Sequence, residues 1–314
     1  MKILVTGGAG FIGSWVADAF IKEGHKVLVV DDLFTGIEGN IPKKAEFIKG
    51  DIRESALLKK VFSNFKPDIV NHHAAQINVR RSVEDPVFDA EVNIIGTLNL
   101  LELSVKHKIK SFIFASSGGA IYGEPKELPA DETTYPIPIS PYGASKYAIE
   151  KYLGYYKAVH GLDYVALRYS NVYGPRQNPH GEAGVLAIFC NRIMSGKPCE
   201  IFGDGNQTRD YVFVGDVAKA NMLSINGPSG SYNIGTQIET SVNDLVTTLR
   251  KVTKREFKVE YSPPRAGEVL RIYLNIHLAK RVLGWSPNVN LEDGICQTWK
   301  WFKDRDSRLV IRDS

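Results

Sequence analysis

Short, continuously apolar runs alternate with longer stretches of helical periodicity through about residue 170. Runs of this kind are typical of strands that are buried on both faces, as in a parallel sheet covered by helices. The alternation therefore predicts a Rossmann-type, doubly wound α/β fold. The predicted strands are residues 2–6, 26–30, 45–50, 67–73, 110–116 and 163–170.

The regular alternation ends after Tyr173, where glycine and proline residues gather between positions 174 and 184. Less regular elements follow, so we expect a smaller, mixed α/β lobe attached to the first one. Residues 209–225 again have the pattern of a strand followed by a helix, which indicates that the chain returns to the first lobe. The predicted division is 1–173 with 209–235 for the first lobe, and 174–208 with 236–314 for the second.

The later part of the chain carries helix signals. Ser241, with Asp244 three residues further on, precedes an apolar run and predicts a helix N-cap. Residues 277–302 have the periodicity of two more helices. We interpret residues 299–308 as the end of an amphipathic helix that gives way to a charged tail.

Composition narrows the class of protein. Lysine plus arginine number 39 and aspartate plus glutamate 35, a formal charge of +4 without a basic block, so we expect no nucleic-acid partner. Cys190, Cys199 and Cys296 are odd in number and lack CxxC spacing, which favours reduced cysteines over disulfides or zinc ligands. A strand follows Met1 directly, and no apolar run approaches the roughly 18 residues of a membrane span. We expect a soluble, cytoplasmic protein.

A glycine-rich turn follows the first predicted strand. Gly7, Gly10 and Gly13 open a helix, and glycine at these positions allows a tight turn, close approach of a pyrophosphate, and packing of helix on strand. The second strand ends in Asp31 and Asp32, where a carboxylate can bind both hydroxyls of an adenosine ribose. Residues 31–40 hold no arginine to attract a 2′-phosphate. The pattern predicts NAD rather than NADP.

Two further groups of polar residues follow strands. Asp51 and Ile52 come after the third strand, where they can reach the adenine, although an aspartate after a strand also serves as a helix cap. His72 and His73 are neighbours at the end of the fourth strand. Their side chains point to opposite faces and cannot bind one metal ion together, so we expect no metal.

Removal of a hydride from an alcohol needs a base for the hydroxyl proton, and a tyrosine with a lysine one helical turn away is suited to that task. Spacing alone does not select a pair, because Tyr-x-x-x-Lys occurs three times, as Tyr122/Lys126, Tyr142/Lys146 and Tyr147/Lys151.

Sequence context selects among the three pairs. The segment from Tyr122 encloses a glycine and a proline, which indicates a loop. Tyr142 stands in the first turn of a helix that has Ser140 as its predicted N-cap and Pro141 as its first residue. Tyr147 lies about 140° further around that helix. We expect Tyr142 and Lys146 to be catalytic, with the positive helix end favouring a phenolate.

The motifs TGGAGFIG, VDD, HHAAQ, YGASK, LRYSNVYGPRQ and GDGNQTRDYVFVGD together resemble the extended short-chain dehydrogenase/reductases, of the NAD-dependent epimerase/dehydratase type, over nearly the whole chain. Within that family, SSGGAIYGE and PHGEAGVLAIF most resemble the UDP-glucose 4-epimerases of bacteria and archaea. The resemblance implies that NAD stays bound throughout turnover. It also implies a UDP-sugar substrate and a homodimer formed by the helices near residues 85–107 and 141–160.

The resemblance implies a reaction cycle. Tyr142 takes the proton of the sugar 4-hydroxyl while the C4 hydride passes to NAD. The 4-keto sugar then turns about its pyrophosphate link and receives the hydride on its other face. By the same resemblance, Lys146 holds the nicotinamide ribose and lowers the pKa of Tyr142, Asn93 lies near the nicotinamide, and Arg209 and Arg265 bind the diphosphate.

Motif and resemblance together define two sets of candidate residues. The expected cofactor-binding residues are Gly7, Gly10, Phe11, Ile12, Gly13, Asp31, Asp32, Asp51, Ile52, His73, Ala74, Ala75, Gln76, Asn93, Ser116, Tyr142, Lys146 and Tyr169. The expected substrate-binding residues are Ser117, Gly118, Tyr142, Ser170, Asn171, Gly184, Val185, Arg209, Arg265 and Glu268.

The chain departs from the family pattern at one position. The usual catalytic serine or threonine stands four residues before the tyrosine of the YG motif, and here that residue is Gly118. We expect the neighbouring Ser117 to bind the sugar hydroxyl instead, since two glycines in succession let the backbone reposition it. The alternative is that Ser116 and Ser117 are only small residues at the end of a strand.

Other functions are compatible with parts of the pattern. A sugar-nucleotide 4,6-dehydratase needs an acid pair where this chain has Gly119 and Ala120, which disfavours elimination. Three other activities stay open: 4-epimerisation of UDP-N-acetylglucosamine, 4-epimerisation of UDP-glucuronate, and decarboxylation of UDP-glucuronate. The residues that select the sugar lie around 182–190 and 268–275, where the motifs are loose. A non-catalytic NAD-sensing module is disfavoured, because the tyrosine and the lysine are both present.

Overall fold

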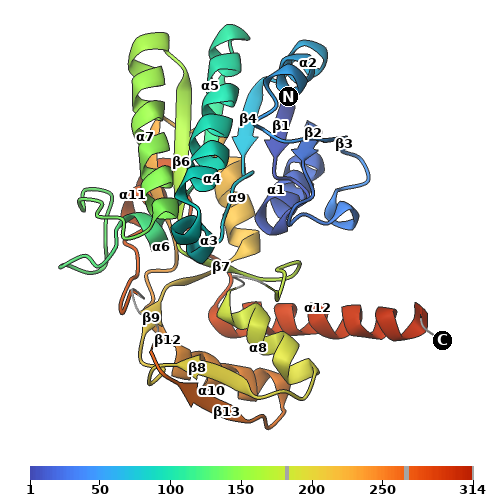
Figure 1. The fold of residues 1–314 in the computed structure, drawn as a ribbon, viewed down its shortest axis with the longest axis vertical. Coiled ribbons are helices and arrows are strands. Elements are labelled where there is room, and N and C mark those ends of the chain that lie inside the picture. Colours follow the sequence, from blue (N-terminus) through green and yellow to red (C-terminus); the bar gives the residue numbers. More distant parts are fainter. Residues whose placement is uncertain (181–183, 265–268, 313–314) are drawn as a thin grey trace.

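The computed structural model describes residues 1–180, 184–264 and 269–312, with the side chains of 305–312 left aside. Its centre is a seven-stranded parallel sheet in the order β11-β6-β5-β4-β1-β2-β3 (Figure 1). All six strands expected from the apolar runs are present, which confirms the α/β prediction. The strands are β1 (Lys2–Thr6), β2 (Lys26–Asp31), β3 (Glu46–Lys49), β4 (Ile69–His72), β5 (Ser111–Ser117), β6 (Asp163–Tyr169) and β11 (Gly230–Ile234).

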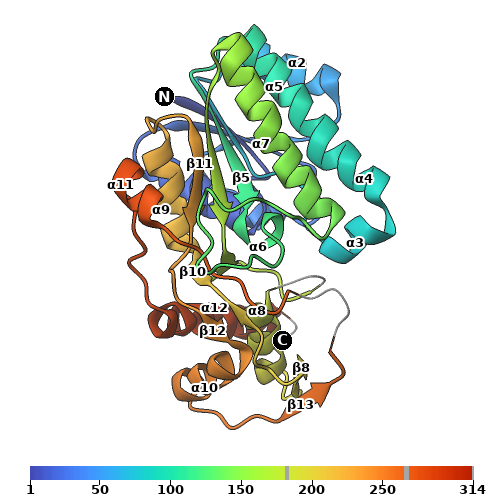
Figure 2. The same ribbon diagram turned by 90° about the vertical axis from the view of Figure 1, so that its left-hand side faces the viewer.

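Helices cover both faces of the sheet, so nearly every residue of the central strands is buried. One face packs on α1 (Phe11–Lys22), α9 (Val214–Ser224) and α11 (His277–Leu283). The other packs on α2 (Ser55–Phe65), α5 (Gly96–Lys106) and α7 (Pro141–His160). Figure 2 shows α7 and α5 side by side on that second face.

Short elements fill the carboxyl edge of the sheet. After β4 come α3 (Val79–Glu84), α4 (Pro86–Ala90) and a π-helical turn, η2 (Glu91–Ile95), that runs directly into α5. A 3-10 turn, η1 (Glu38–Asn40), follows β2, and α6 (Gly118–Ile121) follows β5. These segments lie where ligands bind in open parallel sheets.

The second lobe lies below the sheet in Figure 1 and consists of short strand pairs and helices. The pairs described are β7 with β10, β9 with β12, and β8 with β13. Its core is separate from the two sheet faces. The elements are β7 (Asn171–Tyr173), α8 (Val185–Met194), β8 (Cys199–Phe202), β9 (Thr208–Arg209), β10 (Tyr211–Phe213), β12 (Thr240–Ser241), α10 (Val242–Thr253), β13 (Val259–Ser262) and α12 (Leu291–Arg312).

Two boundary predictions were wrong and one local prediction is confirmed. The segment around α11 packs on the sheet of the first lobe, with Leu283 and Trp285 buried there, because its apolar face continues the surface of α9. Helix α12 continues to Arg312, past the expected charged tail, since neither glycine nor proline interrupts it after residue 294. Ser241 and Asp244 form the expected N-cap as a complete capping box. No helix in the described residues is long and apolar enough to cross a membrane.

Candidate active site

The glycine turn between β1 and α1 forms a close-fitting phosphate cradle. Gly7 has a φ of +70°, and a Cβ added there would lie 2.5 Å from the Ala74 nitrogen. A Cβ on Gly13 would lie 2.2 Å from the Gly7 oxygen. Gly10 is the N-cap of α1 and brings no side chain to the first-turn N–H groups of Phe11 and Ile12. These donors and the helix dipole suit a pyrophosphate.

Asp31 supports the same turn from the end of β2. Its Oδ2 accepts a hydrogen bond from the Ala9 N–H at 2.9 Å, and its Oδ1 accepts one from the Leu33 N–H at 2.8 Å. Burial raises the pKa of Asp31, and the two backbone hydrogen bonds oppose that rise. Asp32 accepts from the Phe34 N–H at 2.9 Å. Asp31 therefore lies against the cradle, and Asp32 follows it; the binding of ribose by either stays a prediction.

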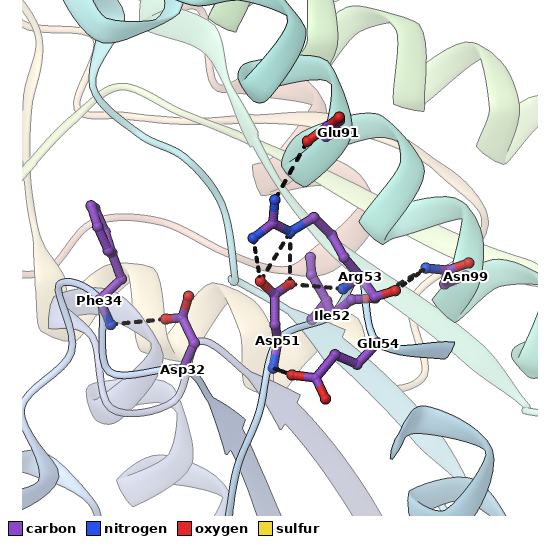
Figure 3. A network of polar contacts seen from close by, with 8 residues as sticks. All are labelled: Asp32, Phe34, Asp51, Ile52, Arg53, Glu54, Glu91 and Asn99. Carbon is purple, nitrogen blue, oxygen red and sulfur yellow. Dashed lines mark hydrogen bonds and ion pairs between the residues drawn. The ribbon is translucent and has the colours of Figure 1, made fainter. Parts of the chain in front are cut away.

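Asp51 is engaged within its own turn, as Figure 3 shows. Its carboxylate accepts hydrogen bonds from Arg53 Nε at 2.9 Å and Arg53 Nη2 at 2.6 Å, and Arg53 also pairs with Glu91 at 3.5 Å. The hydrogen bonds from the Arg53 side chain hold the pKa of Asp51 below its usual value. These contacts pair Asp51 with its neighbour Arg53, whereas the N-cap of α2 is Glu54, so the interpretation of Asp51 as a helix cap was wrong. A contact of Asp51 or the buried Ile52 with adenine stays a prediction.

The loop from His73 to Gln76 follows β4 and borders the cradle. His73 stacks on Tyr169 with their ring centroids 6.1 Å apart, and its Nε2 lies 3.2 Å from the Tyr169 hydroxyl. Burial lowers the pKa of His73 to about 3, so the ring is neutral. Its Nδ1 is buried without a partner. His72 bonds Thr6 and Thr97 instead, so the two histidine side chains diverge as expected.

Tyr142 and Lys146 lie on the first turns of α7, whose start is confirmed as expected. The Ser140 side chain caps the Gly143 N–H, and Pro141 is in the first turn. Lys146 Nζ donates to the Ala115 carbonyl at 2.8 Å and lies 5.7 Å from the centroid of the Tyr142 ring. The lysine therefore contacts the ring and the end of β5 together.

The pKa expected for Tyr142 was wrong for this arrangement. Burial raises the pKa of Tyr142 to about 12, and the hydrogen bond with the Ser117 side chain opposes that rise. Burial lowers the pKa of Lys146 to about 8, while Asp89 opposes that change. The Lys146 ammonium donates to a carbonyl and not to the phenol. Burial of Tyr142 therefore changes the pKa of the phenol more than the charge of Lys146 does.

The surroundings of Ser117 and Gly118 explain why this chain has glycine where the family usually has serine or threonine. Ser117 is the last residue of β5 and hydrogen-bonds the Tyr142 side chain. A Cβ on Gly118 would lie 2.6 Å from Leu274 Cδ1, and Leu274 is fully buried. Leu274 thus occupies the space that a serine or threonine side chain at position 118 would need.

Ser116 points away from Tyr142, as alternation along a strand requires. Its hydroxyl donates to Glu150 Oε1 at 2.6 Å, inside a buried ion pair of Glu150 with Arg168. Tyr122 belongs to this cluster too, since Arg168 Nη1 donates to its hydroxyl at 2.7 Å. The contacts of Tyr122 are structural, which agrees with its rejection as the base. The Ser116 side chain is likewise engaged, so only its backbone is available to a cofactor.

Residues expected to bind substrate lie where the chain passes to the second lobe. Ser170 follows β6, and its Oγ is buried without a partner. Asn171 begins β7, with its Oδ1 3.6 Å from where a Gly119 Cβ would be. Gly184 caps α8 and Val185 is its first residue. Arg209 donates from Nη1 to the Thr208 carbonyl at 2.8 Å. Arg265 and Glu268 lie outside the described residues.

The residues present fit a dinucleotide. The glycine cradle leaves no room for side chains at Gly7 and Gly13, Asp31 bonds the turn, and the buried Nδ1 of His73, in the loop that borders the cradle, has no partner. Sequence reasoning missed Asp89, a buried carboxylate that contacts Asn93 and Gln76. The only signal was its position four residues before Asn93, which is one helical turn.

Comparisons with known proteins agree with this site. Residues 3–235 match the model of the NAD dependent epimerase/dehydratase family. A putative UDP-glucose 4-epimerase of Methanocaldococcus jannaschii is 51% identical over 97% of this chain and 99% of its own. The crystal structure of a Thermotoga maritima UDP-glucose 4-epimerase with UDP-glucose is 48% identical, with a TM-score of 0.95 over 97% of this chain and 99% of its own. A Thermus thermophilus UDP-glucose 4-epimerase with NAD is 44% identical, with a TM-score of 0.93 over 96% and 99%.

Proposed function

Because the chain belongs to the NAD-dependent epimerase/dehydratase family, we propose that it is a UDP-glucose 4-epimerase, which interconverts UDP-glucose and UDP-galactose with a resident NAD. The observation that supports the proposal is the contact of Tyr142 with both Ser117 and Lys146. Bound NAD supplies the chemistry of the cycle by accepting the C4 hydride and returning it. The first turn of α1, Asp31 and Lys146 are the residues that would hold it.

The protein residues manage the proton. Tyr142 exchanges a proton with the sugar 4-hydroxyl, and Ser117, hydrogen-bonded to Tyr142, orients both groups. The phenol is protonated in the structure because burial raises its pKa to about 12. A phenolate needs a compensating positive charge, and Lys146, whose Nζ lies 5.7 Å from the ring centroid, provides one.

The residues after β5 favour epimerisation over elimination. Gly119 and Ala120 carry no acid or base, so nothing there assists the loss of a hydroxyl from C6. A Cβ on Gly119 would meet only Asn171 Oδ1, at 3.6 Å, so the glycine adds no bulk beside Asn171. In the proposed cycle, Ser170 and Asn171 bind the sugar and diphosphate of the UDP-sugar.

The test is to incubate the purified protein, without added NAD, with UDP-galactose, UDP-N-acetylgalactosamine or UDP-glucuronate and to separate the products. Conversion of UDP-galactose to UDP-glucose supports the proposal. Conversion of one of the other two sugars alone would reassign the substrate. A 4-keto-6-deoxy product, or no turnover even with NAD supplied, contradicts epimerase function.

We also propose a homodimer and a cytoplasmic location. Val87 on α4 is 67% exposed, and Val159 and Tyr155 on α7 are 60% and 48% exposed, so neighbouring helices carry an apolar surface for a second copy. The free, buried Cys190 and Cys199 suit a reducing compartment. Light scattering after gel filtration tests the dimer, and Val159→Lys should yield monomers.

A further inference from the structure

Asp89, near the end of α4, is a fully buried carboxylate that the cycle above does not use. Its Oδ2 accepts a hydrogen bond from the Ser145 hydroxyl at 2.6 Å. Its Oδ1 accepts from Gln76 Nε2 at 2.9 Å and from Asn93 Nδ2 at 3.0 Å. The three donors come from α7, from the loop after β4 and from the π-helical turn η2. Asp89 therefore joins the helix that carries Tyr142 to the segment expected at the nicotinamide.

The π-helical turn places Asn93 for this contact. π-helical turns are rare and recur at functional sites. The Asn93 amide pairs with the backbone of Gln76 in both directions, since its Oδ1 accepts from the Gln76 N–H and its Nδ2 donates to the Gln76 carbonyl, each at 2.9 Å. The same Nδ2 reaches Asp89. The turn thus holds both the loop after β4 and the Asp89 carboxylate through the side chain of Asn93.

The network continues to strands β4 and β1 of the central sheet. Thr97 Oγ1 donates to the Asn93 carbonyl at 2.6 Å and lies 2.8 Å from His72 Nε2. His72 Nδ1 lies 2.6 Å from Thr6 Oγ1. Burial holds the pKa of His72 well below its usual value, so this ring is neutral, with its proton on Nε2 as Thr97 requires. A chain of buried hydrogen bonds thus runs from α7 through Asp89 to β1.

Asp89 also acts on the residue after Ser145. Lys146 is only 5% exposed, and in the described structure it interacts with Tyr142, His72, His73 and Asp89. The pKa of Tyr142 is raised and those of both histidines are lowered, so these three are neutral near pH 7. Among these four interaction partners of Lys146, Asp89 is the one that carries a carboxylate.

We propose that Asp89 is a positioning residue of the active site, whose carboxylate fixes the start of α7 on the Gln76–Asn93 segment and balances the charge of the buried Lys146 ammonium. The inference rests on the proposed function for its kinetic readout only. Loss of the carboxylate should displace Tyr142 from the cofactor and let Lys146 release its proton at a lower pH.

Asp89→Asn tests the charge, because the amide keeps the shape and removes the negative charge. The expected result is a fall in kcat of about tenfold or more with KM for UDP-galactose nearly unchanged. The alkaline limb of the kcat profile should move to lower pH by about half a unit or more. Asp216→Asn is the matched control, since Asp216 is also a buried carboxylate and bonds the Val289 N–H at the junction with the second lobe. Its alkaline limb should stay in place.

Ser145→Ala tests the positioning, because it removes one hydrogen bond to Asp89 and keeps the charge. Its kcat should fall about threefold or more, with the alkaline limb unmoved. Ser104→Ala is the control, since Ser104 is a buried serine whose hydroxyl donates within its own helix to the Leu100 carbonyl at 2.7 Å. Its kcat should match the unaltered protein.

An Asp89→Asn profile that coincides with that of the unaltered protein would overturn the charge balance. Equal kcat for the Ser145→Ala and Ser104→Ala variants would overturn the positioning. If Asp89→Asn does not fold, the serine comparison alone decides. If the unaltered protein does not epimerise any sugar, the proposed function fails. The inference is then decided by calorimetric NAD binding from pH 7 to 10, which should weaken at lower pH in Asp89→Asn.

Discussion

The Lys146 ammonium lies 5.7 Å from the centroid of the Tyr142 ring but donates its hydrogen bond to the Ala115 carbonyl at 2.8 Å. The polar contact of the phenol is made by Ser117 instead. In the proposed cycle, the two neighbours of Tyr142 act in different ways: Ser117 contacts the group that exchanges the proton, and Lys146 supplies charge beside the ring. Variants of these residues should separate proton exchange from charge compensation.

Tyr142→Phe should abolish epimerisation and leave NAD bound. In the proposed cycle the phenol exchanges the proton, and loss of an acid–base group costs about a hundredfold or more in kcat. The ring itself, and with it the packing beside Lys146, is retained. A coupled assay of UDP-glucose formation measures kcat, and the NAD released on denaturation measures occupancy. Tyr147→Phe, one turn further along α7 in a packed cluster, is the control and should keep full activity.

Ser117→Ala should lower kcat about tenfold or more, with a small change in KM. The hydrogen bond of Ser117 opposes the burial that raises the pKa of Tyr142, so the alanine variant should raise that pKa further and leave less of the phenolate that accepts the sugar proton. Ser117→Thr keeps the hydroxyl and should recover most of the activity. Full activity of the alanine variant would assign Ser117 to the strand end alone.

Local signals made the cofactor half of the site predictable. A few consecutive residues determine the glycine turn, the position of Asp31 and the Ser140–Pro141 start of α7, because backbone geometry and capping depend on near neighbours. The structure bears out all three placements.

Contacts between distant parts of the chain were not predictable in the same way. Leu274 fills the space beside Gly118 from more than 150 residues away, and Asp89 reaches Ser145 across 56 residues. The pKa of Tyr142 depends on burial, which no spacing of tyrosine and lysine reveals. Helix α12 continues past the residues predicted to form a charged tail, because charge alone does not end a helix.

Gly118→Ser should destabilise the protein by about 1–3 kcal/mol, because the new Cβ would lie 2.6 Å from Leu274 Cδ1 and 3.2 Å from the Arg168 carbonyl. Leu274→Ala alone should also destabilise it, through the cavity it leaves. Urea unfolding of both variants and the double variant completes a cycle. The double variant should be more stable than the sum of the two losses predicts, and strict additivity would mean that the two side chains do not compete.

Glu150→Gln should lower the free energy of unfolding by about 3–5 kcal/mol. Glu150 and Arg168 are 4% and 7% exposed and lie 2.6 Å apart, so the glutamine variant leaves a buried guanidinium without its counter-charge. Thermal and urea unfolding measure the loss. Glu260→Gln, which breaks the exposed pair with Lys258, is the control and should change stability by about 1 kcal/mol or less. A similar loss in both variants would contradict the role of burial.

Lys146 should give activity and stability opposite dependences on pH. Burial lowers its pKa in the folded protein to about 8 from 10.5, so the ammonium that Tyr142 needs is lost as the pH rises through about 8, and kcat should fall there. The unfolded chain binds more protons than the folded one between pH 8 and 10.5, so the contribution of Lys146 to the free energy of unfolding rises across that window, by about 3 kcal/mol.

Rate measurements from pH 6 to 10 and chemical unfolding over the same range test both signs. Lys146→Met removes the titrating group and should be inactive, with a flatter dependence of stability on pH above 8. Tyr142 does not enter this window, because its pKa is raised to about 12. Activity that stays constant to pH 10 would mean that Lys146 keeps its proton in the working enzyme. If the free energy of unfolding of the unaltered protein does not rise with pH relative to that of Lys146→Met, Lys146 keeps its proton in the free protein as well.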